Sequence, residues 1–257
     1  MEDGHPTMLE LLLEAHIGLE RQGPGSPETV RRALAFLGPP ERFQKIADLG
    51  CGTGGQTLLL AQALPGEIVG LDLFPAMAEK LNERARARGF GDRVRGVAGD
   101  MGDLPFERQS FDLIWSEGAV DNIGLEAGLR HWRDFLRPGG CVAVSCPCWL
   151  TPERPEAVAR FWAEAGSPLD AVETNVGILR GCGYRFVAAF ALTEDCWTEH
   201  YFAPRERAIQ AMLEKYPESA EMRTYAALNR EEVALYRQFG RHYGYVFFIG
   251  RLDGTPA

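Results

Sequence analysis

The amino-acid sequence predicts an α/β protein with a doubly wound, Rossmann-like sheet of seven mostly parallel strands and an antiparallel last strand. Two observations lead to this prediction. Short apolar segments alternate with helical segments of about 10–15 residues, as they do in βαβ units. A glycine-rich turn within residues 46–55 joins the first of these strands to the helix after it. The length of 257 residues fits one domain with insertions.

The first 40 residues are expected to form N-terminal helices ahead of the sheet. Apolar side chains recur at helical spacing over residues 9–17, and the Gly-Pro-Gly-Ser sequence at 23–26 ends this pattern. Ser26 is a predicted N-cap, and the proline after it suits the first position of a second helix over residues 27–37.

Strands and helices alternate from residue 41 onward. Apolar runs predict seven strands, at residues 45–49, 67–72, 93–98, 111–116, 140–146, 185–192 and 243–251. The segments between them predict helices at residues 55–64, 75–88, 125–136 and 169–182.

Two segments interrupt this alternation, at residues 149–167 and 193–242. The first carries a predicted helix over 153–165, and the second is largely helical. Both are expected to emerge at the carboxyl edge of the parallel strands, where open α/β sheets bind their ligands. We therefore expect them to form a helical lid over the site within a single domain, 1–257.

Composition and charge limit the partners of this protein. Lys and Arg total 27 against 36 Asp and Glu, so the formal net charge is −9, which argues against nucleic acid and membrane surfaces. No apolar run approaches the roughly 20 residues of a membrane span, and no signal-peptide pattern is recognised. Six irregularly spaced cysteines predict neither a disulfide framework nor a metal site. We expect a cytoplasmic protein, possibly a homodimer.

The glycine turn is the sharpest motif, with the sequence Ile-Ala-Asp-Leu-Gly-Cys-Gly-Thr-Gly-Gly at 46–55. Glycine allows a tight turn and a close approach of ligand to backbone, and the helix N-terminus after it favours anionic groups. Gly50, Gly52 and Gly55 also satisfy the dinucleotide pattern G-x-G-x-x-G. An NAD-dependent oxidoreductase is therefore one alternative.

The segment resembles motif I of the class I S-adenosylmethionine (SAM)-dependent methyltransferases, D-x-G-x-G-x-G, at Asp48, Gly50, Gly52 and Gly54. Further features of that family follow in order: Asp72 ends the second strand, and Gly-Asp-Met at 99–101, Phe-Asp-Leu-Ile-Trp at 111–115 and Leu-Arg-Pro-Gly-Gly at 136–140 come after it. Flanking segments at 23–27, 115–118 and 196–202 resemble a ubiquinone/menaquinone-type subgroup.

This resemblance implies SAM as cofactor, S-adenosyl-L-homocysteine as product, and residues 41–148 as the SAM-binding half. Asp72 would accept the ribose hydroxyls, Asp100 the adenine amino group, and Asp48 would contact the methionine part. The full cofactor set that the resemblance implies is Asp48, Gly50, Cys51, Gly52, Thr53, Gly54, Gln56, Asp72, Leu73, Asp100, Met101, Ser116 and Glu117.

The expected reaction is methyl transfer to a small-molecule acceptor. The nucleobase amino-methylase signature after the fourth strand is absent, since Ser116 is followed by Glu-Gly-Ala. Methyl transfer depends mainly on positioning, and a base is needed only where the acceptor must lose a proton. A non-catalytic SAM-binding module is a second alternative.

Three residues are candidates for catalysis. Glu117 and Asp121 follow the fourth strand, which should end near the reacting methyl, and His200 lies in the second lid segment and titrates near neutral pH. Asp121 could instead cap the next helix, and His200 could be a solvated side chain. His16, on the first helix, is expected to be a surface or packing residue.

Overall fold

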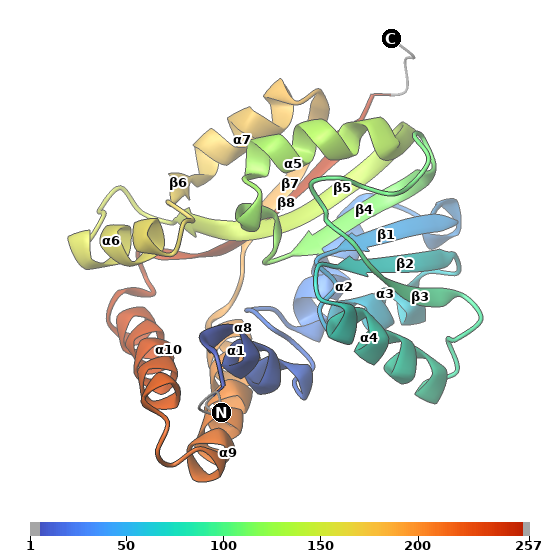
Figure 1. Ribbon diagram of the computed structural model, residues 1–257. Coiled ribbons are helices and arrows are strands. Elements are labelled where there is room, and N and C mark those ends of the chain that lie inside the picture. Colours follow the sequence, from blue (N-terminus) through green and yellow to red (C-terminus); the bar gives the residue numbers. More distant parts are fainter. Residues whose placement is uncertain (1–5, 254–257) are drawn as a thin grey trace.

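The computed structural model describes residues 6–253 and contains one sheet with helices on both faces (Figure 1). Its strands are β1 (Lys45–Leu49), β2 (Glu67–Asp72), β3 (Val94–Ala98), β4 (Phe111–Glu117), β5 (Leu136–Trp149), β6 (Asp170–Ala171), β7 (Tyr184–Ala191) and β8 (Tyr243–Leu252). The strand order is β3-β2-β1-β4-β5-β8-β7, and β8 runs antiparallel to both of its neighbours. The predicted mostly parallel sheet with an antiparallel last strand is confirmed.

The helices that connect the strands lie on both faces of this sheet. They are α1 (Met8–Ile17), α2 (Pro27–Leu37), α3 (Gly55–Ala63), α4 (Pro75–Ala87), α5 (Leu125–Trp132), α6 (Glu156–Glu164), α7 (Val172–Gly181), α8 (Glu194–Trp197), α9 (Ala203–Lys215) and α10 (Ala220–Phe239). A π-helical turn, Thr198–Phe202, joins α8 to α9. The predicted cap of α2 is present, because Ser26 Oγ accepts a hydrogen bond from the backbone N–H of Thr29 at 3.1 Å.

The seven predicted strands form the main path of the sheet, and the two-residue β6 pairs with the end of β5 as an eighth. The predicted bounds of the fifth strand are wrong, because it begins at Leu136 instead of residue 140 and runs to Trp149. Leu136 pairs with Phe111 of β4, and β8 pairs with the strand residue by residue from 141 to 149, which satisfies its backbone groups up to its late end.

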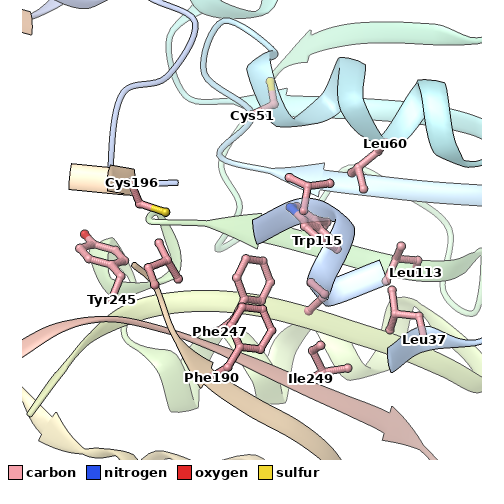
Figure 2. Packing of buried hydrophobic residues seen from close by; sticks show 14 of the residues in the cluster. Leu37, Cys51, Leu60, Leu113, Trp115, Phe190, Cys196, Tyr245, Phe247 and Ile249 are labelled. Atoms are coloured by element: carbon pink, nitrogen blue, oxygen red, sulfur yellow. The ribbon is translucent and has the colours of Figure 1, made fainter. Parts of the chain in front are cut away.

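Apolar side chains fill both faces of the sheet, which explains why its central strands read as continuous apolar runs. One core packs β4 and β8 against α2 and α3, and the other packs the same strands against α5 and α7. Figure 2 shows the first of these cores, where the Phe247 ring lies 5.1 Å from that of Trp115 and 5.6 Å from that of Phe190.

A separate apolar cluster joins the N-terminal helix to the second insertion. Leu11 and Ala15 of α1 pack against Ile209 and Met212 of α9 and against Met222 of α10. Figure 1 shows α1 beside α9, away from the sheet. The N-terminal helix is therefore held by the insertion rather than by the main core.

Within residues 6–253, all six cysteines are free and buried, and no group of three His, Cys, Asp or Glu side chains is arranged to hold a metal ion. The described helices are all too short or too polar to cross a membrane. The ends of the predicted domain, residues 1–5 and 254–257, lie outside the described residues.

Candidate functional site

A cavity of about 450 Å³ lies at the carboxyl edge of the sheet, beside the glycine turn that follows β1. This volume is typical of small-molecule pockets, which span roughly 300–1,000 Å³. The predicted ligand-binding residues that line the cavity are Gly50, Gly52, Gln56, Asp72, Leu73, Met101 and Glu117. A second hollow of about 540 Å³ lies at the amino ends of β1 and β2, and its described lining contains none of the predicted site residues.

The glycine turn has the backbone geometry that its sequence predicts. Gly50, Gly52 and Gly54 have φ angles of 74°, 52° and 88°, which lie in the left-handed region that L side chains rarely adopt. The backbone N–H groups of Gly50 and Cys51 donate to the carbonyl of Leu71 at 2.8 and 3.0 Å. The turn is thereby fixed against the end of β2, and its backbone forms one wall of the cavity.

Asp72 is held in place by two backbone donors. Its Oδ2 accepts from the N–H of Gly52 at 2.8 Å, and its Oδ1 accepts from the N–H of Phe74 at 3.0 Å. Burial raises the pKa of this carboxyl, and the two hydrogen bonds act in the opposite direction. Each carboxylate oxygen can accept a further hydrogen bond, so Asp72 can receive two hydroxyl groups from a ligand in the cavity.

Asp48 lies beneath the turn and is fully buried. Thr57 Oγ1 donates to its Oδ2 at 2.5 Å, while Oδ1 has no hydrogen-bond partner in the described part of the chain. Burial raises the pKa of Asp48 to about 7, and the nearby Glu117 carboxylate adds to this effect. Asp48 therefore supports the turn from below and carries a carboxyl that titrates near neutral pH.

Arg21 and Glu117 form a buried ion pair in the cavity wall. Arg21 Nη1 donates to Glu117 Oε2 at 2.7 Å, and the side chains are 8% and 4% exposed. Trp115 Nε1 donates to the other Glu117 oxygen at 2.9 Å. Nη2 of Arg21 is buried and has no partner within residues 6–253. The wall thus contains a guanidinium with an unused donor beside a carboxylate whose two oxygens are both engaged.

Gln22 connects the N-terminal segment to the glycine turn. Its side-chain oxygen accepts from the N–H of Thr53 at 3.1 Å, and its side-chain amide donates to Thr53 Oγ1 at 3.0 Å and to the carbonyl of His16 at 3.2 Å. Arg84 of α4 also donates to Thr53 Oγ1, at 2.6 Å. These hydrogen bonds fix residues 16–22 against the glycine turn.

Comparisons with known proteins match this geometry to one family. Residues 46–140, which contain the glycine turn, match the family model described as "Methyltransferase domain". Over these residues the chain is similar to the methyltransferases. The resemblance inferred from the sequence is thereby confirmed at the level of the family, and the quinone-type subgroup stays a prediction.

Curated relatives match about half of the chain. Geranyl diphosphate 2-C-methyltransferase of Streptomyces lasalocidi is 33% identical over 116 residues, which are 45% of this chain and 39% of that protein. Tocopherol O-methyltransferase of Arabidopsis thaliana is 27% identical over 143 residues, or 52% and 40% of the two chains. The chain thus spans about two fifths of the length of these relatives.

A solved structure extends the likeness in fold to nearly the whole chain. The chain superposes on a SAM-dependent methyltransferase from Geobacter sulfurreducens, solved with S-adenosyl-L-homocysteine, at a TM-score of 0.80. The two are 22% identical, and the match covers 93% of this chain and 96% of the other. The likeness in fold therefore extends well beyond residues 46–140.

The structure places the remaining predicted cofactor residues outside the cavity lining. Asp100 is exposed, and its Oδ1 accepts from the N–H of Gly102 at 2.7 Å. Ser116 is buried, and its hydroxyl has no partner among the described residues. Cys51, Thr53 and Gly54 contribute to the inner side of the turn, with Cys51 fully buried.

Of the three catalytic candidates, the structure places Glu117 alone in the described cavity lining. Asp121 is turned toward Ser167, whose hydroxyl donates to Oδ2 at 3.2 Å, and burial raises its pKa. His200 lies near the surface, with its side chain 35% exposed and Nε2 3.9 Å from Asp195 Oδ2. The geometry therefore does not bring these three side chains together.

Sequence reasoning missed the residues that the N-terminal segment supplies. Leu12, His16, Arg21 and Gln22 all line the cavity, although His16 was expected to be a surface or packing residue. The one sequence signal near them is the Gly-Pro-Gly-Ser segment at 23–26, which resembles the flank of a methyltransferase subgroup. Hydrophobic spacing in α1 predicts a helix but not which element lies opposite it.

The predicted lid segments contribute little to the cavity wall as it stands. Among the described residues, Tyr201 is the one member of 193–242 that lines the cavity, and residues 149–167 lie outside the lining. Tyr201 belongs to the π-helical turn, a local irregularity common at functional sites. A lid formed by both insertions stays a prediction.

Proposed function

We propose that this protein binds SAM in the cavity and transfers its sulfonium methyl group to a small-molecule acceptor. The observation that carries the proposal is the position of Asp72 and Arg21 in one cavity beside a glycine turn with left-handed geometry. SAM presents the hydroxyls of its ribose and, beyond the sulfonium, an amino-acid carboxylate. The two side chains match those groups in charge and in hydrogen-bonding type.

The unpaired Nη2 donor of Arg21 is the feature that tests whether SAM fits the cavity. A buried guanidinium N–H without a partner costs free energy, and a ligand carboxylate would satisfy it. Asp72 would hold the ribose hydroxyls, and the methionine part would lie against the backbone of the turn. Glu117, close to Arg21, would accept the ammonium group. The residues present therefore fit SAM.

When bound, SAM supplies a methyl group on a positively charged sulfur, a good leaving group. The described residues would position this group rather than activate it, because alignment at close distance accounts for much of the rate of such displacements. Glu117 is assigned to cofactor binding rather than to catalysis, since its oxygens already accept from Arg21 and Trp115.

The relatives support a small-molecule acceptor. Their names specify tocopherol, geranyl diphosphate and phosphoethanolamine, which differ in chemistry but share low molecular mass. The net charge of −9 disfavours a nucleic-acid substrate. The cytoplasmic location, the homodimer and the quinone-type subgroup remain predictions.

Calorimetric titration of the purified chain with SAM, S-adenosyl-L-homocysteine and NAD tests the proposal. Micromolar binding of the first two without binding of NAD is the expected result. Binding of NAD without binding of SAM would overturn the proposal and would identify the glycine turn as a dinucleotide-binding turn. Mass spectrometry of a mixed acceptor panel then separates an enzyme, which adds the mass of one methylene group to an acceptor, from a module that only binds SAM.

A further inference from the structure

His16 has a fixed tautomer that leaves one ring nitrogen unused. Its Nδ1 lies 2.8 Å from the backbone carbonyl oxygen of Leu12. Because a carbonyl oxygen can only accept a hydrogen bond, Nδ1 must carry the proton. Nε2 is then the deprotonated nitrogen of a neutral imidazole, and the bond to Leu12 is the one hydrogen bond of the ring within residues 6–253. The ring therefore carries an available lone pair.

The surroundings of His16 keep the ring neutral. The residue is 7% exposed, and burial lowers its pKa, with the positive charge of Arg205 acting in the same direction. The charged or titratable groups on the elements packed against α1 include Arg205 and Lys215 of α9, Tyr225 and Glu232 of α10, Arg84 and Arg88 of α4, and the tyrosine of the π-helical turn, Tyr201. Glu232 is itself paired with Arg205 at 2.6 Å.

The ring is also fixed relative to the glycine turn. The carbonyl of His16 accepts from Gln22, which is bonded in turn to Thr53. On its other side, α1 packs against α9 and α10 through Leu11 and Ala15. His16, Leu12 and Tyr201 line the same cavity as Asp72 and Glu117. An acceptor that enters this cavity beside SAM would thus meet an imidazole with a defined position.

We propose that His16 is the general base of the reaction and that the methyl acceptor is a protic nucleophile, an O–H, S–H or N–H compound. This inference rests on the proposed function. The acceptor's electron pair forms the bond to the methyl carbon, and the carbon–sulfur bond breaks with its pair left on sulfur. The acceptor proton passes to Nε2. One positive charge leaves the sulfonium and one appears on the imidazolium, so the net charge of the cavity is unchanged.

The other carboxylates near the cavity are less suited to this role. Both oxygens of Glu117 already accept from strong donors, and Asp72 accepts from two backbone N–H groups and is assigned to the ribose. Asp121 is turned toward Ser167. Among the described lining residues, His16 is the base that is uncharged and whose acceptor nitrogen has no hydrogen-bond partner.

The test compares wild type with His16→Asn, whose side-chain amide can still donate to Leu12 but has no counterpart of Nε2. His16→Gln serves as a second variant in case His16→Asn folds poorly, and Leu12→Ala is a cavity control without a proton-transfer role. Nitrogen-15 NMR of the full chain first reports the tautomer of His16, and titration with S-adenosyl-L-homocysteine reports the cofactor site. We expect the Nδ1–H form and unchanged affinity in the variants.

Methyl transfer from SAM is then measured on a probe panel of phenol, catechol, thiophenol and aniline derivatives. We expect kcat of both His16 variants to fall about 100-fold or more with KM nearly unchanged, the size of effect usual for a general base. The deficit should shrink above the pKa of the acceptor itself, where its proton is already lost. A positioning role would leave the deficit constant with pH.

The outcomes separate the two proposals. Loss of S-adenosyl-L-homocysteine binding by the wild type overturns the proposed function. If S-adenosyl-L-homocysteine binds, three other results overturn the assignment of His16 and leave the cofactor site intact. These are an Nε2–H tautomer, wild-type rates in the His16 variants, and methylation of none of the protic probes.

Discussion

Arg21 and Glu117 face each other across the cavity wall, with Nη1 and Oε2 2.7 Å apart and both side chains almost fully buried. The pair joins the N-terminal segment to the end of β4, across 96 positions in the sequence. Removal of one partner of a buried pair leaves the other charge uncompensated, and such losses typically reach about 3–5 kcal/mol. We expect Arg21→Ala to lower the free energy of unfolding by that amount in urea titrations.

The double variant Arg21→Met, Glu117→Gln is the matched control because it removes both charges together. It should recover most of the stability lost in Arg21→Ala while still failing to bind SAM tightly. If the single and double variants were equally destabilised, packing of the Arg21 side chain rather than its charge would explain the effect.

Asp72→Ala is expected to weaken binding of S-adenosyl-L-homocysteine at least tenfold, because each hydrogen bond to a charged group is worth about 1.5–3 kcal/mol. Asp100→Ala is the matched control. Its carboxylate is exposed and bonded to the N–H of Gly102, so affinity should change by no more than about twofold, as for other surface substitutions. Calorimetry measures both. A tenfold loss in Asp100→Ala would restore the adenine role expected from the sequence.

Asp48 should make stability depend on pH near neutrality. Burial raises its pKa from the usual 3.8 to about 7, so the folded state binds more protons than the unfolded state between these values. The free energy of unfolding should therefore fall as pH rises from about 4 to about 7, and level off above that range.

Asp48→Asn keeps the shape of the side chain and an oxygen for Thr57 but does not titrate. Melting temperatures measured from pH 5 to pH 8 should decrease less in this variant than in wild type, with the larger gain over wild type at pH 8. Parallel curves for the two proteins would show that Asp48 is not the group responsible.

Gly52→Ala is expected to abolish tight cofactor binding. Gly52 has a φ of 52°, and an added Cβ would collide with the side-chain oxygen of Gln22, which ties the N-terminal segment to the turn. Gly89→Ala is the control, since its φ of 76° imposes the same kind of backbone strain with no atom within 4 Å of the added Cβ. The left-handed conformation alone costs roughly 1–2 kcal/mol.

Affinity for S-adenosyl-L-homocysteine and hydrogen exchange in α1 distinguish these two variants. Gly52→Ala should lose affinity at least tenfold, or about 1.4 kcal/mol, and exchange faster in α1. Gly89→Ala should lose stability but keep its affinity. Equal affinities in the two variants would mean that Gln22 moves aside without consequence.

Local patterns predicted the main elements of the sheet because strands and helices differ in the period of their apolar residues. Two boundaries could not be predicted in this way. The early start of β5 depends on pairing of Leu136 with β4. Its late end depends on pairing with β8, about a hundred residues later in the chain, and β6 pairs with that extension. Strand length is set here by the neighbour rather than by the segment itself.

The sequence by itself determined the family, the glycine turn and the position of Asp72, because these are encoded in contiguous residues with strict backbone requirements. Tertiary structure alone decided that Asp100 is exposed, that Glu117 is paired with Arg21, and that His16 lies in the cavity. Each of these outcomes depends on which distant segments meet at the sheet edge, and the spacing of residues within one helix or loop carries no information about its partner.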